Sequence, residues 1–176
     1  MDTRPTSDRL RETLFNVLAP RIEGARVLDL YAGSGAVGIE ALSRGAKETV
    51  FVERADSALK ALRGNLARLG LKAEVHKASA ASFLRKAGSG AGDAGRQFDV
   101  VFLDPPYEAA VEYEAALTLL SGAAQGLLRD GAVVIAEHRR KDNLEEWYGA
   151  LKRTRLLEQG DAALSFYQIE GAAATE

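Results

Sequence analysis

The chain alternates between short apolar runs and longer segments in which apolar residues recur every three or four positions. The apolar runs have the length and composition of buried strands and occupy residues 25–31, 48–53, 73–76, 98–103 and 132–137. The segment 55–69, which separates two of these runs, repeats leucine at helical spacing. Strands that alternate with helices in this way predict a parallel sheet with helices on both faces.

Both ends of the pattern add elements to this core. The first helix is predicted to begin with Thr6 or Ser7 as its N-cap and to extend to Pro20. Further helices are expected through Ile39, Leu42 and Ser43, around 80–85, over a segment carrying Val111, Ala115, Leu117 and Leu120, and near 142–150 with Trp147. Residues 152–158 and 163–169 predict a closing hairpin and therefore an antiparallel edge. The expected fold is α/β and Rossmann-like, with a mostly parallel seven-stranded sheet.

Composition narrows the functional classes. The 176 residues suffice for one domain, expected over residues 1–170, while the glycine-rich run 88–95 and the tail 171–176 are expected to be flexible or disordered. The absence of cysteine fits a reducing cytoplasm and excludes disulfides, cysteine-ligated metals and a cysteine nucleophile. Since His76 and His138 are the two histidines, no metal centre is expected. No stretch is apolar for long enough to span a bilayer.

The charge balance restricts how this chain could bind nucleic acid. A formal net charge of -2 gives no overall attraction to a polyanion. Basic residues nevertheless gather locally, near the start of the chain and in the run 139–141. Binding to nucleic acid would therefore depend on one asymmetric face of the molecule.

A glycine-rich turn between the first strand and the next helix suggests a nucleotide cofactor. Residues 33–38 read G-S-G-A-V-G, a match to G-x-G-x-x-G, which does not by itself separate NAD from S-adenosylmethionine. Asp29, just before the turn, would oppose a pyrophosphate but suits the cationic amino group of a methionine moiety. Glu53 ends the second strand and could hold both ribose hydroxyls. Ser79 follows the third strand and could face the adenine edge, cap the next helix, or do both.

The residues after the fourth strand, Asp104-Pro105-Pro106-Tyr107, favour a site for a planar group that carries an NH2. Two prolines fix the backbone and remove two N–H donors, so the Pro105 carbonyl is free to accept a bond beside the Asp104 carboxylate. Tyr107 adds a flat face for stacking. These are two acceptors and a platform, which suit the exocyclic amine of a nucleobase.

Two longer blocks resemble the RsmD family of class I methyltransferases, which modify a guanine N2 in bacterial small-subunit ribosomal RNA. The first block, residues 29–46, reads D-L-Y-A-G-S-G-A-V-G-I-E-A-L-S-R-G-A, and the second begins T-R-P-T-S-D-R-L-R-E at Thr3 and continues to L-F-N at 14–16. D-P-P-Y stands where this family places its catalytic D-P-P-[YF]. The resemblance spans roughly residues 3–170. It implies an S-adenosylmethionine-dependent enzyme that acts on ribosomal RNA, within a small-subunit particle, and we expect a monomer without metal or membrane association.

The candidate residues fall into three groups. The catalytic group comprises Asp104, Pro105, Pro106 and Tyr107. The cofactor-binding group comprises Asp29, Tyr31, Ala32, Gly33, Ser34, Gly35, Gly38, Glu53, Arg54, Ser79 and Ala80. The RNA-binding group, on the N-terminal helix block 3–20, comprises Arg4, Thr6, Arg9 and Arg11.

Other interpretations of these residues stay open. The family usually carries a basic β-hairpin before the T-R-P-T block, and the sequence lacks one, so weak binding of free RNA is expected. The same D-P-P-Y would serve a DNA adenine N6 or a protein glutamine amide as methyl acceptor. In an NAD(P)-dependent oxidoreductase the segment 104–107 would be only a turn. A non-catalytic RNA-binding factor would retain the cavity without using it.

Overall fold

The computed structural model describes residues 5–89, 96–106 and 110–170, with the backbone alone for 5–7. Its helices are α1 (Pro5–Ile22), α2 (Ala36–Ser43), α3 (Asp56–Arg68), α4 (Ala80–Gly88), α5 (Ala110–Ser121) and the 3-10 turn η1 (Gln125–Leu127). Its strands are β1 (Arg26–Asp29), β2 (Glu48–Glu53), β3 (Glu74–Lys77), β4 (Phe98–Leu103), β5 (Leu128–Arg139), β6 (Trp147–Tyr148), β7 (Leu151–Gln159) and β8 (Ala162–Ile169).

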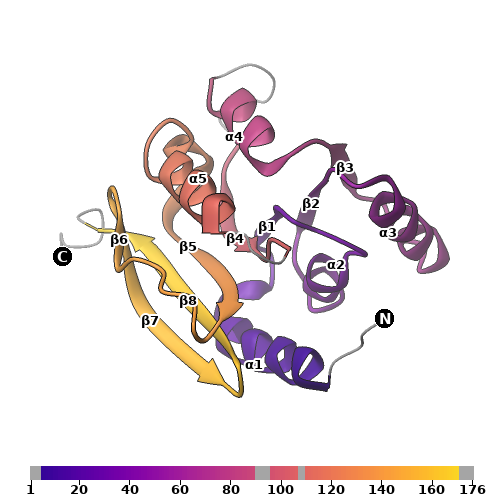
Figure 1. Cartoon of the computed structure of the whole chain (residues 1–176). Coiled ribbons are helices and arrows are strands. Elements are labelled where there is room, and N and C mark those ends of the chain that lie inside the picture. Colours follow the sequence, from indigo (N-terminus) through magenta and orange to yellow (C-terminus); the bar gives the residue numbers. More distant parts are fainter. Residues whose placement is uncertain (1–4, 90–95, 107–109, 171–176) are drawn as a thin grey trace.

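One sheet joins these strands in the order β3-β2-β1-β4-β5-β8-β7-β6 (Figure 1). The first five strands in that order pair in parallel, and β8 pairs antiparallel with β5. The α/β fold with a parallel core and an antiparallel edge is therefore confirmed. The expected closing hairpin is β7 and β8, which turn at Gly160 with a φ of 61°.

The sheet has eight strands in place of the expected seven, because the segment around Trp147 is a strand and the predicted helix near 142–150 is wrong. Trp147 pairs with Lys152 in a short hairpin that turns at Gly149, whose φ is 57°. A Cβ at Gly149 would lie 2.4 Å from Oγ of Ser121, so the close approach to α5 favours glycine. Tyr148 is buried and packs edge-on against Tyr167. Tertiary packing of this aromatic pair thus overrides the local helical pattern.

The sheet is covered on both faces, which explains why its central strands are apolar at nearly every position. Val27 and Val100 face one side, where α1 forms a buried cluster with the sheet. Leu28 and Val101 face the other side, in a cluster with α4 and α5. On the first face, α2 and α3 continue the layer over β2. Among the described residues, no helix has the length and hydropathy needed to cross a membrane.

Helix α1 is longer at both ends than predicted. It begins at Pro5, a residue suited to the first helical turn, so Thr6 and Ser7 lie inside the helix and not at its cap. It also passes through Pro20 to Ile22. The missing N–H of Pro20 removes one backbone bond in the last turn. Ile22 is only 4% exposed in the core, and this burial offsets the loss.

The start of α5, the glycine-rich run and the C-terminal tail complete the comparison with the expected elements. Val111 lies in the expected helix, at the start of α5, where it is 77% exposed. The loop expected at 88–95 begins later, because Gly88 still belongs to α4, and 90–95 lie outside the described residues. The tail 171–176 lies outside them as well.

Helix α2 approaches β2 so closely that one glycine separates them. A Cβ at Gly38 would lie 2.2 Å from Cε1 of Phe51 and 2.8 Å from Cγ2 of Thr49. Phe51 is fully buried and cannot move without disturbing the core. The third glycine of G-x-G-x-x-G is therefore required by helix–strand packing.

We predict that Gly38→Ala lowers the free energy of unfolding by about 1–3 kcal/mol, the usual cost of overpacking a core. Gly64→Ala is the matched control, because a Cβ at this exposed position of α3 meets nothing within 4 Å. It should stabilise the protein by about 0.5–1 kcal/mol, since alanine favours helix. Urea denaturation of both variants measures the two changes, and a neutral Gly38→Ala would contradict the packing argument.

Candidate functional site

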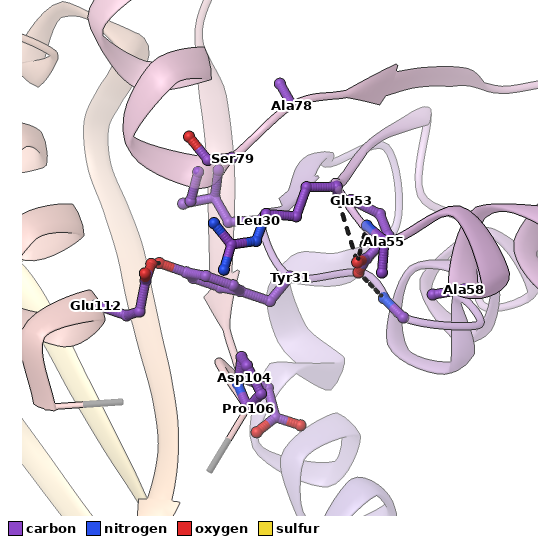
Figure 2. A pocket seen from close by; sticks show the side chains of 13 residues that line it. Leu30, Tyr31, Glu53, Ala55, Ala58, Ala78, Ser79, Asp104, Pro106 and Glu112 are labelled. Atoms are coloured by element: carbon purple, nitrogen blue, oxygen red, sulfur yellow. Dashed lines mark hydrogen bonds between the residues drawn. The ribbon is translucent and has the colours of Figure 1, made fainter. Parts of the chain in front are cut away.

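A cavity of about 410 Å³ opens at the carboxyl ends of β1, β2, β3 and β4. It is lined by Leu30, Tyr31, Gly33, Glu53, Arg54, Ala55, Ala58, Ala78, Ser79, Ala80, Asp104, Pro106 and Glu112. In Figure 2, Tyr31 reaches across the centre, between Glu53 and Glu112, with Ser79 to one side of its ring and Asp104 to the other. Members of the sequence-predicted cofactor and catalytic groups thus meet in one cavity.

The glycine-rich turn forms one wall of this cavity. Gly33 and Gly35 have φ values of 58° and 93°, which glycine adopts without strain. The N–H of Gly35 donates to the Ala32 carbonyl at 2.8 Å, closing the turn. Gly33 lines the cavity, whereas Ala32, Ser34 and Gly35 shape the loop from outside it. The Ser34 carbonyl, for example, accepts from the Asn65 side chain of α3 at 2.9 Å.

Glu53 holds that turn in place. One carboxylate oxygen accepts the Gly33 N–H at 2.7 Å, and the other accepts the N–H groups of Arg54 and Ala55 at 3.1 and 2.9 Å. Two carboxylate oxygens offer about four lone pairs, of which these bonds use three, so capacity for one ligand hydroxyl is left. Glu53 therefore both orders the loop and presents an anionic edge to the cavity.

Asp29 lies behind the loop, outside the set that lines the cavity. It is 1% exposed, and its carboxylate accepts the N–H of Gly38 at 3.1 Å. Burial raises the pKa of Asp29 from 3.8 to about 7; the Glu53 charge adds to this, while the Gly38 hydrogen bond opposes it. The structure thus shows Asp29 fastening α2 to the end of β1, so an effect on a bound ligand would pass through the loop.

Small side chains form the wall across from Glu53. Ser79 accepts the Ser82 N–H at 3.1 Å, which confirms its expected role as N-cap of α4. Ala78, Ala80, Ala55 and Ala58 also line the cavity. Small side chains of this kind leave room for a planar ring.

Asp104 and Pro106 of the D-P-P-Y segment lie at the opposite end. Asp104 follows β4, is exposed, and lines the cavity together with Pro106. Pro105 is buried and is not part of the lining. Tyr107 lies outside the described residues, so its predicted stacking role stays a prediction.

Glu112 was not predicted from the sequence. It lies in the first turn of α5, lines the cavity, and accepts the Tyr31 hydroxyl proton at 2.8 Å. Burial, followed by this hydrogen bond, raises the pKa of Tyr31, so the phenol stays protonated and donates. The sequence signal that could have identified Glu112 is an acidic residue in the first turn of the helix that follows D-P-P-Y. Leu30, Ala55, Ala58 and Ala78 were also missed, since apolar lining carries no motif.

The predicted RNA-binding residues are only partly described. Arg4 lies outside the described residues, as does the side chain of Thr6. Arg9 is exposed on α1. Arg11 instead pairs with Asp8 at 3.5 Å and with Glu40 of α2 at 3.6 Å. Arg11 therefore links two helices, while Arg9 remains available to an outside partner.

The fold and the cavity define the class of this protein. The strand order β3-β2-β1-β4-β5 runs outward in one direction from β1 to β3 and in the other from β1 to β5, and the cavity lies at the strand ends around this switch point. A glycine-rich turn after β1, an acid after β2 and D-P-P after β4 surround it. Among the described residues, no group of His, Cys, Asp and Glu is arranged to hold a metal ion. These features make the protein a class I methyltransferase.

The chain belongs to the RsmD family: the family model described as Conserved hypothetical protein 95 matches residues 1–168. It is 38% identical over 168 residues to Ribosomal RNA small subunit methyltransferase D of Escherichia coli (strain K12), covering 95% of this chain and 80% of that protein. The Haemophilus influenzae protein of the same name is 39% identical over 150 residues, 82% and 74% of the two chains.

A solved structure extends the comparison to a liganded enzyme. The 16S rRNA N2 methyltransferase RsmC of T. thermophilus, in complex with AdoMet and guanosine, superposes with a TM-score of 0.71 at 26% identity. The match covers 96% of this chain and 44% of that chain. The present domain therefore corresponds to part of that larger enzyme.

The raised pKa of Asp29 predicts a pH-dependent stability. Because its pKa is higher in the folded state, the contribution of Asp29 to stability is present below 3.8 and is lost as the pH rises through about 7. Asp29→Asn cannot ionise and keeps an oxygen that can accept the Gly38 N–H. Its unfolding free energy, relative to wild type, should therefore increase across this pH range. Urea denaturation at several pH values measures the difference.

Asp130→Asn serves as the control, because Asp130 is exposed near the amino end of β5, away from the strand ends that carry the cavity. Its difference from wild type should show little pH dependence. Curves for Asp29→Asn and wild type that stay parallel between pH 4 and 7 would contradict the assignment of the raised pKa to Asp29.

Proposed function

We propose that this protein transfers a methyl group from S-adenosylmethionine to the exocyclic N2 of a guanine in small-subunit ribosomal RNA. The observation that carries the proposal is the single cavity that joins Glu53 and Ser79 at one end to Asp104 and Pro106 at the other. The first end suits a nucleoside and the second suits an amine. The relatives named as small-subunit rRNA methyltransferases support the substrate, and RsmC with its guanosine supports the base.

The residues at the cofactor end fit an adenosine. The remaining lone pair of Glu53 suits one ribose hydroxyl, so holding both would require a backbone N–H to give up its bond, while Ala55, Ala58 and Ala78 add apolar lining for the adenine. Ser79 can contact the ring edge although its Oγ already caps α4, since a hydroxyl oxygen has two lone pairs and a proton. When bound, S-adenosylmethionine supplies an electrophilic methyl group on a sulfonium.

Asp104 and the Pro105 carbonyl would act on the acceptor. The N2 lone pair of guanine is delocalised into its ring, so the nitrogen is a poor nucleophile. Two acceptors that bind its N–H groups draw it toward tetrahedral geometry and align the lone pair with the methyl carbon. The N–C bond forms as the C–S bond breaks, and the proton that N2 then loses passes to Asp104 or to water. Alignment of this kind is worth roughly 7–11 kcal/mol of barrier.

Methyl transfer from labelled cofactor tests this function. Small-subunit RNA, assembled small-subunit particles, DNA and protein are offered as acceptors, and the labelled nucleoside is identified. We expect N2-methylguanosine in small-subunit RNA, either free or within particles. Label found in DNA adenine or in a protein amide would mean that the same site methylates another acceptor. If NAD(P) raises the melting temperature and S-adenosylmethionine does not, the protein is an oxidoreductase and the proposed methyl transfer is wrong.

We predict that Asp104→Ala abolishes methyl transfer and leaves cofactor affinity nearly unchanged, because Asp104 faces the acceptor while Glu53 lies at the cofactor end. Single-turnover assays give the first quantity and calorimetry with S-adenosylhomocysteine the second. Asp130→Ala, near the amino end of β5, should change neither. A variant that loses cofactor affinity but turns over at saturating cofactor would overturn the role of Asp104.

RNA binding should depend on Arg9 more than on Arg11. With a net charge of -2 the protein should bind free small-subunit RNA weakly, with a shallow salt dependence. Arg9→Ala should reduce the slope of log affinity against log salt by about one, as one phosphate contact is lost. Arg11→Ala should change it little, because this side chain is already paired with Asp8 and Glu40. Filter binding across a salt series measures both slopes.

A further inference from the structure

The acceptor end of the cavity contains a second carboxylate with no role in the reaction described above. Glu112 and Asp104 line the same cavity of about 410 Å³, from α5 and from the end of β4. Figure 2 shows Glu112 at the hydroxyl end of the Tyr31 ring and Asp104 on one side of that ring, with its carboxylate turned away from Glu112. A base bound across this part of the cavity would reach both residues.

The Glu112 carboxylate is held in position from two sides. One oxygen accepts the Tyr31 hydroxyl proton at 2.8 Å, and Tyr31 is itself anchored at the end of β1. Among the described residues, Tyr31 is the one recorded hydrogen-bond partner of Glu112. The next residue, Tyr113, is buried and donates to the Glu137 carbonyl of β5, which fixes the first turn of α5 against the sheet. The second carboxylate oxygen can accept a bond from a ligand.

A fixed carboxylate beside an amine acceptor distinguishes the bases by chemistry. On its Watson–Crick edge guanine has adjacent N1–H and N2–H donors, and two carboxylates match them. Adenine N1 and cytosine N3 are lone pairs beside their amines, and each would face the carboxylate without a proton between them. Such a mismatch leaves polar groups unpaired in a closed site and repels the wrong base.

From this arrangement we infer that Glu112, oriented by Tyr31, reads the N1–H of guanine and makes the enzyme specific for that base. Asp104 acts on the amine that is methylated, and Glu112 identifies the ring that carries it. This inference rests on the proposed function, since it assumes a guanine at Asp104. It assigns to this chain a specificity residue on α5 outside the D-P-P-Y and glycine motifs.

The test uses an RNA fragment that contains the mapped methylation site, with either guanine or 2-aminopurine at the target position. Both bases carry the N2 amine, but 2-aminopurine has a lone pair at N1. Wild type should methylate 2-aminopurine at least about 100-fold less efficiently, because the analogue lacks the N1–H donor and leaves a charged acceptor of the site unpaired. In Glu112→Gln the amide can either accept from N1–H or donate to N1. The ratio should therefore fall by about 10-fold or more, chiefly through a gain on 2-aminopurine.

Two further variants separate recognition from mere integrity of the cavity. Tyr31→Phe keeps the ring and removes the hydroxyl that orients Glu112, so the base preference should fall part of the way. Glu114→Gln removes an exposed charge from the same helix and should preserve the wild-type ratio. Calorimetry with S-adenosylhomocysteine should give the same dissociation constant for wild type and Glu112→Gln.

The outcomes distinguish this inference from the proposed function. If wild type methylates no guanine N2, the proposed function fails. If wild type methylates guanine but Glu112→Gln keeps its full preference over 2-aminopurine, the inference about Glu112 is wrong. A Glu112→Gln variant that loses cofactor affinity while keeping base preference would also overturn it, because Glu112 would then belong to the cofactor end.

Discussion

The carboxylate of Glu53 organises the site, because it ties the glycine-rich turn after β1 to the turn after β2. Three backbone N–H groups converge on it, from Gly33, Arg54 and Ala55. Without these bonds the N–H groups at the carboxyl edge of the sheet would need other partners. Behind the same turn, Asp29 accepts the N–H of Gly38 and fixes the start of α2. The cavity depends on both carboxylates, one at its wall and one beneath it.

Close packing beneath the turn makes this arrangement rigid. Gly38 lets α2 rest directly on Phe51 and Thr49 of β2, so the turn has little freedom to shift. Burial of Asp29 raises its pKa, so ionising this residue near neutral pH lowers the stability of the protein. Asp29 lies directly behind the glycine-rich turn that shapes the site. Burial of both faces of the sheet offsets this loss of stability. The parallel strands thus provide the stability on which this polar site is built.

The functional geometry follows from where the strand order reverses. Strands β2 and β4 lie on either side of β1, so the turns after these three strands meet at one edge. Glu53, the glycine turn and Asp104 come from those three turns, although they are distant in sequence. Helix α5 follows β4 and brings Glu112 to the same cavity. Residues from separate motifs therefore line one cavity.

The sequence by itself determined the alternation of strands and helices, the parallel core, the closing hairpin and the motifs at the strand ends. Those features are local: apolar periodicity, a glycine turn and an acid at a strand end are readable within a few residues. Only the tertiary structure decided that Trp147 lies in a strand, because that segment is set by the contact of Tyr148 with Tyr167 and of Gly149 with Ser121. It also decided that Asp29 lies under the loop, that Arg11 is paired, and that Glu112 meets Tyr31. Each of these depends on which distant side chain occupies the neighbouring space, and that information is absent from any local pattern.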